Sequence, residues 1–142
     1  MFVADSNVVI SCLHGRGTVH KAFLINSLLD RYEFIAPEFL WVEVDKHMEE
    51  LIAETKYSPD EFKEILEFLE EEIDIVPAEE FLKFLPKAKE MLQGHTKDAL
   101  YLALSLKYDT QIFSGDTILK NLCPDRVITP RELLDKLSAK EP

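Results

Sequence analysis

The chain has 142 residues, of which 46% are hydrophobic and 30% are charged, and we expect a single domain over residues 1–142 with one hydrophobic core. No apolar run approaches the ~20 residues of a membrane-spanning helix, and the opening MFVADSN lacks the basic and apolar regions of a signal peptide. The two cysteines, Cys12 and Cys123, match neither a disulfide framework nor a zinc spacing. We therefore expect a cytoplasmic protein with no membrane role.

The net charge of −11, from 16 basic and 27 acidic residues, is unusual for a nucleic-acid-binding protein, because such proteins usually carry a basic surface. Residues 60–74 hold eight acids and one base, so this segment contributes −7, and the remaining 15 bases and 19 acids contribute −4. We interpret the acidic run as the solvent-exposed face of one helix. That helix can face away from a substrate, so the composition leaves nucleic-acid binding open without supporting it.

The first half of the chain alternates apolar strands with amphipathic helices. Thr18 is expected to cap one helix, and Ser58 and Glu61 form a capping box at the start of another. The expected elements are strands at Met1–Ala4 and Phe34–Ala36, helices at Asn7–Leu13, Thr18–Arg31 and Glu38–Thr55, and a helix that begins after Ser58.

The second half continues this alternation. Thr96 is expected to cap a helix that is apolar almost all round and therefore buried, and Thr129 and Glu132 form a second capping box. Short strands that alternate with helices predict an α/β fold, in which helices cover both faces of a parallel sheet and the crossovers are right-handed. The expected elements are an edge strand at Asp74–Pro77, helical turns over Glu79–Gln93 broken at Pro86, a helix at Thr96–Lys107, strands at Gln111–Ser114 and Val127–Ile128, and a terminal helix after Thr129.

Four carboxylates occupy positions near the expected carboxyl ends of the strands, where open parallel sheets bind their ligands. Asp5 follows the first strand, and Asp116 follows the strand at Gln111–Ser114 after one glycine. Asp98 opens the buried helix, and Glu43 lies between two valines in the helix after the second strand. Each also has a local explanation: Asp5 and Asp116 as helix caps, Asp98 as a first-turn acid and Glu43 as a solvent-facing residue.

If these four carboxylates converge, they repel one another and raise each other's pKa values unless a cation lies among them. Ligands that are all oxygen atoms suit Mg²⁺ or Mn²⁺ rather than zinc. Such an ion activates water and neutralises charge on a phosphate that is being cleaved. If they converge, the four acids therefore indicate a site for a divalent cation.

Four segments of the chain resemble motifs of the PIN-domain superfamily, which includes the toxin nucleases of bacterial and archaeal toxin–antitoxin pairs. Val3–Asn7 resembles the first motif, a strand ending in Asp followed by small polar residues. Glu43 falls at the expected place in the helix after the second strand. Lys97–Ser105 resembles an Asp-led helix rich in Ala and Leu, and Ile112–Asp116 resembles the closing strand motif. The order and spacing of these motifs carry the resemblance, which covers nearly the whole chain.

The resemblance implies a three-layer α/β/α sandwich with a parallel sheet of four or five strands. It also implies an endoribonuclease that uses Mg²⁺ or Mn²⁺ to cleave RNA, with an antitoxin protein and a homodimer as further expected partners. Many relatives carry another acid shortly after the closing Asp, and Thr117–Asn121 lacks one, which puts a second metal ion in doubt. The implied catalytic and metal-binding residues are Asp5, Glu43, Asp98 and Asp116, with Ser6, Asn7 and Ser114 as polar supports.

Other interpretations stay open. Residues 6–29 contain no acid but include Arg16 and Lys21, which could contact RNA phosphates or simply belong to an ordinary loop and helix. The alternative function is a catalytically degenerate PIN fold that binds RNA or acts as a scaffold. Two features favour it: Thr117–Asn121 lacks an acid, and the net charge of the chain is negative. A receiver-like signalling domain is disfavoured, because such a domain needs an Asp at the end of its third strand and a Lys after its last strand, and the chain does not show this arrangement.

Overall fold

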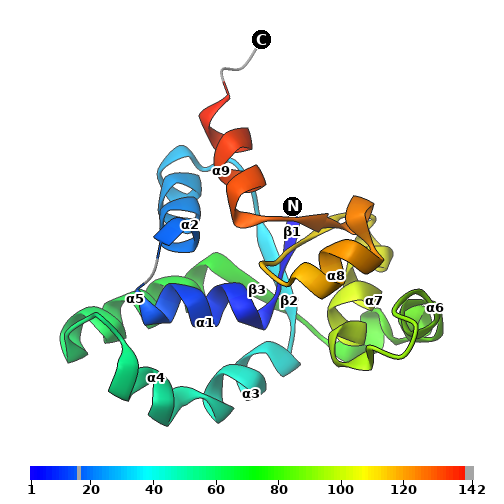
Figure 1. The fold of residues 1–142 in the computed structure, drawn as a ribbon, viewed down its shortest axis with the longest axis horizontal. Helices are drawn as coiled ribbons and strands as arrows, with labels where there is room; N and C mark the ends of the chain where they lie inside the picture. The colour runs from blue at the N-terminus through cyan, green and yellow to red at the C-terminus, as the bar shows by residue number, and fades with distance from the viewer. Residues whose placement is uncertain (16, 140–142) are drawn as a thin grey trace.

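The computed structural model describes residues 1–15 and 17–139 and contains a five-stranded parallel sheet (Figure 1). The strand order is β3-β2-β1-β4-β5, and every neighbouring pair is parallel. The strands are β1 (Phe2–Ala4), β2 (Phe34–Pro37), β3 (Ile73–Val76), β4 (Gln111–Phe113) and β5 (Val127–Ile128). The predicted α/β fold with a parallel sheet is confirmed.

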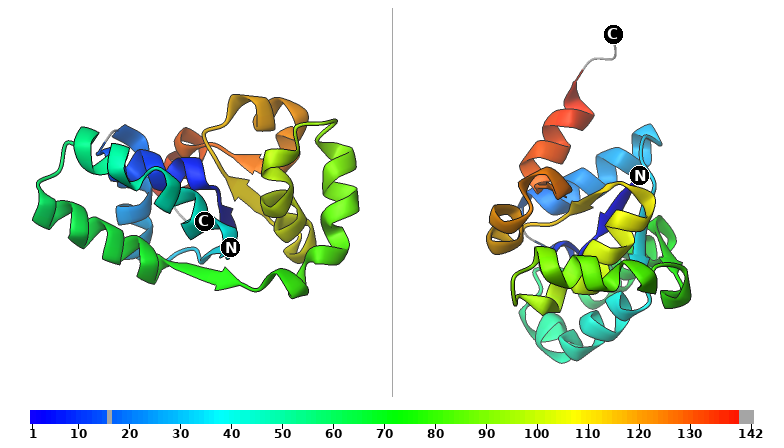
Figure 2. Two further views of the ribbon diagram at one scale, coloured as in Figure 1. Left: turned by 90° about the horizontal axis from the view of Figure 1, so that it is seen from below. Right: turned by 90° about the vertical axis from the view of Figure 1, so that its right-hand side faces the viewer.

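Helices cover both faces of this sheet, which confirms the expected three-layer arrangement (Figures 1 and 2). On one face α7 packs against β1, β2 and β4, and α6 packs on α7. On the other face α2 packs against the sheet and is itself covered by α9. The α-helices are α1 (Ser6–His14), α2 (Gly17–Leu29), α3 (Phe39–Lys46), α4 (Met48–Glu54), α5 (Pro59–Glu72), α6 (Leu85–Met91), α7 (Ala99–Tyr108), α8 (Thr117–Leu122) and α9 (Pro130–Ser138), with 3₁₀ turns η1 (Ala78–Glu80), η2 (Leu82–Phe84), η3 (Thr96–Asp98) and η4 (Pro124–Arg126).

An aromatic cluster joins α2 to the centre of the sheet. The ring of Phe23 lies 4.9 Å from that of Phe34 in β2 and 5.4 Å from that of Phe113 in β4, measured between centroids. All three side chains are almost completely buried. Because both faces of a parallel sheet are covered, its strands read as continuous apolar runs, and this is why short runs such as Phe2–Ala4 predicted strands correctly.

Both capping boxes are confirmed, and they set the starts of α5 and α9. The Ser58 hydroxyl accepts the Glu61 N–H at 3.2 Å, and the Thr129 hydroxyl accepts the Glu132 N–H at 3.1 Å. The acidic residues of α5 lie on its exposed or half-buried faces, as the composition predicted. None of the helices over residues 1–15 and 17–139 has the length and hydrophobicity that crossing a bilayer requires.

The single helix predicted over Glu38–Thr55 is wrong, because the chain forms α3 and α4 with a break at His47. The φ and ψ angles of His47 are −102° and 3°, outside the helical region, and its N–H bonds to the Val44 carbonyl. Apolar residues keep helical spacing across the break, so periodicity did not reveal it. The break ends the helix that carries Glu43 after eight residues.

Three smaller boundary predictions are also wrong. Thr18 lies inside α2, which begins at Gly17, so Thr18 is not the cap. Pro86 does not break a helix but lies in the first turn of α6, where its missing N–H leaves no bond unmade. Thr96 begins the turn η3 instead of capping an α-helix, and α7 starts later, after Asp98.

Replacing Phe23 by alanine is expected to lower the free energy of unfolding by about 3–5 kcal/mol, because it removes the ring that packs on both β2 and β4. Leu28→Ala is the matched control on the same helix, since the Leu28 side chain is 77% exposed and should contribute little. Urea unfolding of both variants tests this packing. Equal losses for the two variants would contradict it.

Candidate metal site

The four candidate carboxylates gather near the point where the strand order reverses. From β1 the chain proceeds outward to β2 and β3 and then returns to β4 on the other side of β1. Ala4 pairs with Phe113, so Asp5 and Ser114 follow directly at the carboxyl ends of two adjacent strands. Open parallel sheets bind ligands at this switch point, because the connections after the two strands diverge there.

The Ser114 side chain connects these two strand ends. Its buried hydroxyl donates a 2.7 Å hydrogen bond to Oδ2 of Asp5. The same oxygen accepts the Asp116 N–H at 3.0 Å and the Asn7 side-chain amide at 3.2 Å. One hydroxyl therefore orients the Asp5 carboxylate and fixes the turn that carries Asp116.

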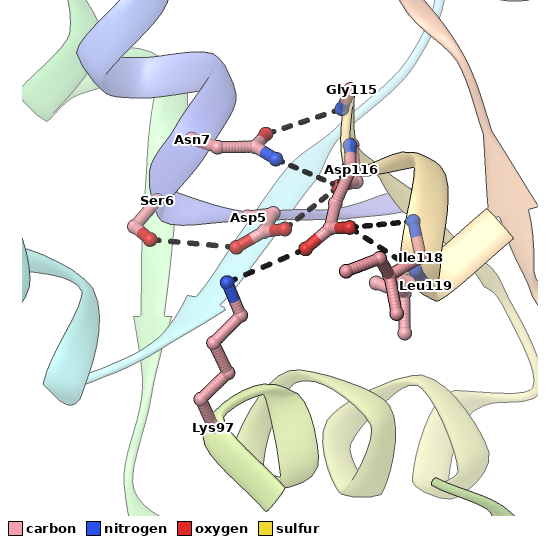
Figure 3. A network of polar contacts seen from close by, with 9 residues as sticks. Asp5, Ser6, Asn7, Lys97, Gly115, Asp116, Ile118 and Leu119 are labelled. Carbon is pink, nitrogen blue, oxygen red and sulfur yellow. Dashed lines mark hydrogen bonds and ion pairs between the residues drawn. The ribbon is translucent and has the colours of Figure 1, made fainter. Parts of the chain in front are cut away.

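Asn7 and Ser6 complete this polar network from the first turn of α1 (Figure 3). Oδ1 of Asn7 accepts the Gly115 N–H at 3.2 Å, and the Ser6 hydroxyl donates to Oδ1 of Asp5 at 3.4 Å. Ser6 and Asn7 thus contact Asp5, Ser114 and Gly115, and their role as polar supports of a metal ion stays a prediction. Asp5 itself occupies the N-cap position of α1 but makes no side-chain capping bond, so its local explanation is wrong.

Asp116 combines a local role with one that points toward the site. Its Oδ1 accepts the N–H groups of Ile118 at 2.9 Å and Leu119 at 3.2 Å, which confirms it as the cap of α8. Its Oδ2 lies 3.6 Å from Nζ of Lys97, whose side chain is 75% exposed (Figure 3). One carboxylate oxygen is therefore held by the backbone, while the other is paired with a solvent-exposed lysine.

Asp98 and Glu43 approach from two further helices. Asp98 is buried at the junction of η3 and α7, and like Asp5 it makes no side-chain capping bond. Glu43 is half-buried on α3 rather than facing solvent, and it accepts a hydrogen bond from the Tyr101 hydroxyl on α7. The solvent-facing explanation for Glu43 is therefore wrong.

The pKa values of two of these carboxylates are raised by burial and, to a smaller extent, by the charges of the other carboxylates. Burial raises the pKa of Asp5 to about 6, Ser114 opposes this, and the charges of Glu43 and Asp116 add to it. Burial raises the pKa of Asp98 to about 7, with further contributions from the other three carboxylates and an opposing one from Lys97. Buried acids that repel one another are the arrangement that a cation stabilises.

Burial and the neighbouring Glu43 also raise the pKa of Tyr101, so its phenol keeps its proton and remains a donor. Sequence reasoning assigned no role to Tyr101 or to Lys97. The spacing offered a signal for both, since Lys97 is adjacent to Asp98 and Tyr101 lies three residues later on the same helical face.

The weak RNA-binding candidates receive no further support. Arg16 lies outside the described residues, and Lys21 is exposed in the first part of α2. Between Asp5 and α2 lies the nine-residue helix α1, which is roughly 13 Å long. Lys21 therefore comes after the carboxyl-terminal end of α1, while Asp5 lies at the amino-terminal end of that helix.

The donor set fits a hard divalent cation in its chemistry, because it offers carboxylate oxygens and carries mutually repelling charge. Within residues 1–15 and 17–139, however, no three Asp, Glu, His or Cys side chains stand in an arrangement that could hold an ion as they are. Instead Ser114, Lys97 and Tyr101 each engage a carboxylate. Binding a cation would require some of these side chains to turn.

Fold and site together define an α/β/α domain with an acidic cluster at the switch point of its sheet. A family model described as PIN domain matches residues 3–122, and the chain therefore belongs to the PIN-domain family. This confirms the resemblance seen in the motifs. PIN domains are generally nucleases that use divalent metal ions.

Comparison with solved structures shows a similarity to a chain described as "Toxin-antitoxin complex from Klebsiella pneumoniae". The TM-score is 0.65 at 14% sequence identity, over 92% of this chain and 98% of that chain. At this identity the similarity shows the fold alone. A search of curated proteins finds no match.

The raised pKa of Asp5 predicts how the metal-free protein responds to pH. A carboxylate whose folded-state pKa lies above its unfolded value stabilises the fold fully below about pH 4, and this contribution is lost as the pH rises through about 6. Asp5→Asn has no such charge to bury, so at pH 8 it is expected to be more stable than the unaltered protein by about 3 kcal/mol.

Urea unfolding in the presence of a chelator at pH 4, 6 and 8 measures this difference. The stability gained by Asp5→Asn should grow across that range. Glu64→Gln, an exposed acid on α5, is the control and should show no growth. A gain that is independent of pH would contradict the assignment of a buried, destabilising charge to Asp5.

Proposed function

We propose that this protein is a metal-dependent endoribonuclease in which Asp5, Glu43, Asp98 and Asp116 bind Mg²⁺ or Mn²⁺. The observation that carries the proposal is the convergence of the four carboxylates: burial raises the pKa values of Asp5 and Asp98, and the charges of the neighbouring carboxylates add to this rise. Membership of the PIN-domain family supports the choice of a nuclease over other magnesium-dependent functions.

Each side chain has a task that follows from how it is held. Asp5, oriented by Ser114, and Asp98, buried just before α7, provide the buried negative oxygens. Glu43 approaches from α3 and orients or deprotonates the attacking water. A divalent cation supplies charge neutralisation and lowers the pKa of bound water. Electrostatic positioning by these residues accounts for most of the rate enhancement.

The acidic character of the chain is compatible with an RNA substrate. The acids of residues 60–74 lie mainly on α5, whose last turn leads directly into the amino end of β3. In a parallel sheet the amino ends of all strands lie on the side opposite their carboxyl ends. The acids in the last turn of α5 therefore lie away from the candidate site, which is at the carboxyl ends. At the site itself, exposed Lys97 offers a positive charge to a phosphate.

The same proposal covers the biological setting. We propose a single domain over residues 1–142 in the cytoplasm that acts as the toxin of a toxin–antitoxin pair, binds an antitoxin protein and forms a homodimer. The likeness of the fold to a chain described as a toxin–antitoxin complex supports the antitoxin as a partner.

A catalytically degenerate PIN fold that binds RNA or serves as a scaffold is the second candidate. It is favoured by the absence, within the described ranges, of three acids arranged around a common point. The lack of an acid in Thr117–Asn121 also favours the degenerate fold. The two candidates differ in whether the folded protein binds a divalent cation and cleaves RNA.

Asp98→Asn is expected to lower the rate of RNA cleavage by at least about 100-fold, because it removes a buried charge that positions the cation. Cleavage of a labelled RNA in Mn²⁺ measures the rate, and calorimetry measures Mn²⁺ affinity. Glu64→Gln is the control and should match the unaltered protein. Unchanged cleavage by Asp98→Asn would exclude this active site, and an unaltered protein that binds no Mn²⁺ would favour the degenerate fold.

Lys97→Met is expected to raise the affinity for Mn²⁺ about two- to fivefold, because the lysine competes with the cation for Asp116 and repels it. Calorimetry at low ionic strength gives the affinity. Lys107→Met, an exposed lysine near the other end of α7, serves as the control and should change it little. Weaker Mn²⁺ binding by Lys97→Met would contradict the competition.

A further inference from the structure

Tyr101 is the largest polar side chain buried next to the candidate site. Tyr101 is 1% exposed and belongs to α7, the helix that packs against the sheet. A phenol buried to this extent needs a hydrogen-bond partner for its hydroxyl. In this chain the partner is Oε1 of Glu43, a carboxylate oxygen on a different helix.

Glu43 is held differently from Asp5 and Asp116. Asp5 is oriented by Ser114 at a strand end, and Asp116 by the N–H groups at the start of α8. Glu43 projects from the middle of the short helix α3, with more rotatable bonds than an aspartate and with part of its surface in solvent. Holding such a side chain in one conformation costs entropy, which a hydrogen bond from a rigid donor offsets.

Tyr101 is suited to this task because its own conformation is fixed. The ring is enclosed by the core, and the hydroxyl reaches Glu43 from α7, the helix that follows Asp98. Asp98 is the N-cap of α7, and Tyr101 lies in the first turn of that helix. One helix therefore supplies one carboxylate of the cluster and orients another.

We propose that Tyr101 is a positioning residue, which holds the Glu43 carboxylate in place for the divalent cation. This inference rests on the proposed function, because it assigns Tyr101 a role at the same site. Tyr101 acts through Glu43 and has no contact of its own with RNA or metal in the proposal. Hydrogen-bonded residues behind the ligands of metal sites typically change metal affinity 10- to 100-fold when they are replaced.

The test variant is Tyr101→Phe, which removes the hydroxyl and keeps the buried ring. Tyr108→Phe is the matched control: Tyr108 lies on the same helix and its hydroxyl also donates to a glutamate, Glu80, at 3.4 Å, but it is exposed and outside the site. Both variants are also made in a Glu43→Ala background. Calorimetry measures the Mn²⁺ affinity of each protein, and urea unfolding without metal measures its stability.

Tyr101→Phe is expected to weaken Mn²⁺ binding about 10-fold or more, while Tyr108→Phe leaves it unchanged. In the Glu43→Ala background Tyr101→Phe should cause no further loss, because the group through which it acts is gone. In metal-free unfolding the Tyr101→Phe and Glu43→Ala effects should likewise be non-additive.

The inference is overturned if Tyr101→Phe binds Mn²⁺ as tightly as the unaltered protein, or if it weakens binding equally with and without Glu43. It is also overturned if the two substitutions are additive in metal-free unfolding, a result that does not depend on metal binding. An unaltered protein that binds no Mn²⁺ would overturn the proposed function together with this inference. If only the role of Tyr101 is wrong, the unaltered protein still binds Mn²⁺ and Asp98→Asn still fails to cleave RNA.

Discussion

The hydroxyl of Ser114 is the contact on which the geometry of the site depends. It joins the ends of two strands that are 109 residues apart in sequence, by donating to Asp5 and accepting from the turn that carries Asp116. This contact is possible because β1 and β4 are paired in register at Ala4 and Phe113. The aromatic cluster of α2 packs on the neighbouring strands, so the core of the domain supports the same register.

The cluster works against the stability of the domain when no cation is bound. Burial and mutual repulsion raise the pKa values of Asp5 and Asp98, so keeping both ionised at neutral pH has a cost. Other groups of the chain reduce that cost: a serine, a lysine and a tyrosine each engage one of the carboxylates. Ser114 and Tyr101 thereby hold Asp5 and Glu43 in one orientation, and Lys97 lies beside Asp116.

Sequence reasoning was accurate where a local pattern has one physical cause. The capping boxes at Ser58 and Thr129 were predicted correctly, since a side chain that bonds the backbone three residues later acts within one turn. It failed at His47, because the apolar stripe continues through the break between α3 and α4 and periodicity therefore gives no sign of it. It also failed at Thr96, where η3 delays the start of α7 and leaves Asp98 at the helix entrance.

The sequence by itself determined the kind of fold and the chemical type of the candidate site. Strands buried on both faces must be apolar, and acids directly after such strands lie at one edge of the sheet, so Asp5 and Asp116 were visible in the pattern. Only the tertiary structure decided which groups face these acids. Lys97, Tyr101 and Ser114 reach their partners across different elements, and such contacts depend on helix packing and strand order, which no local periodicity encodes.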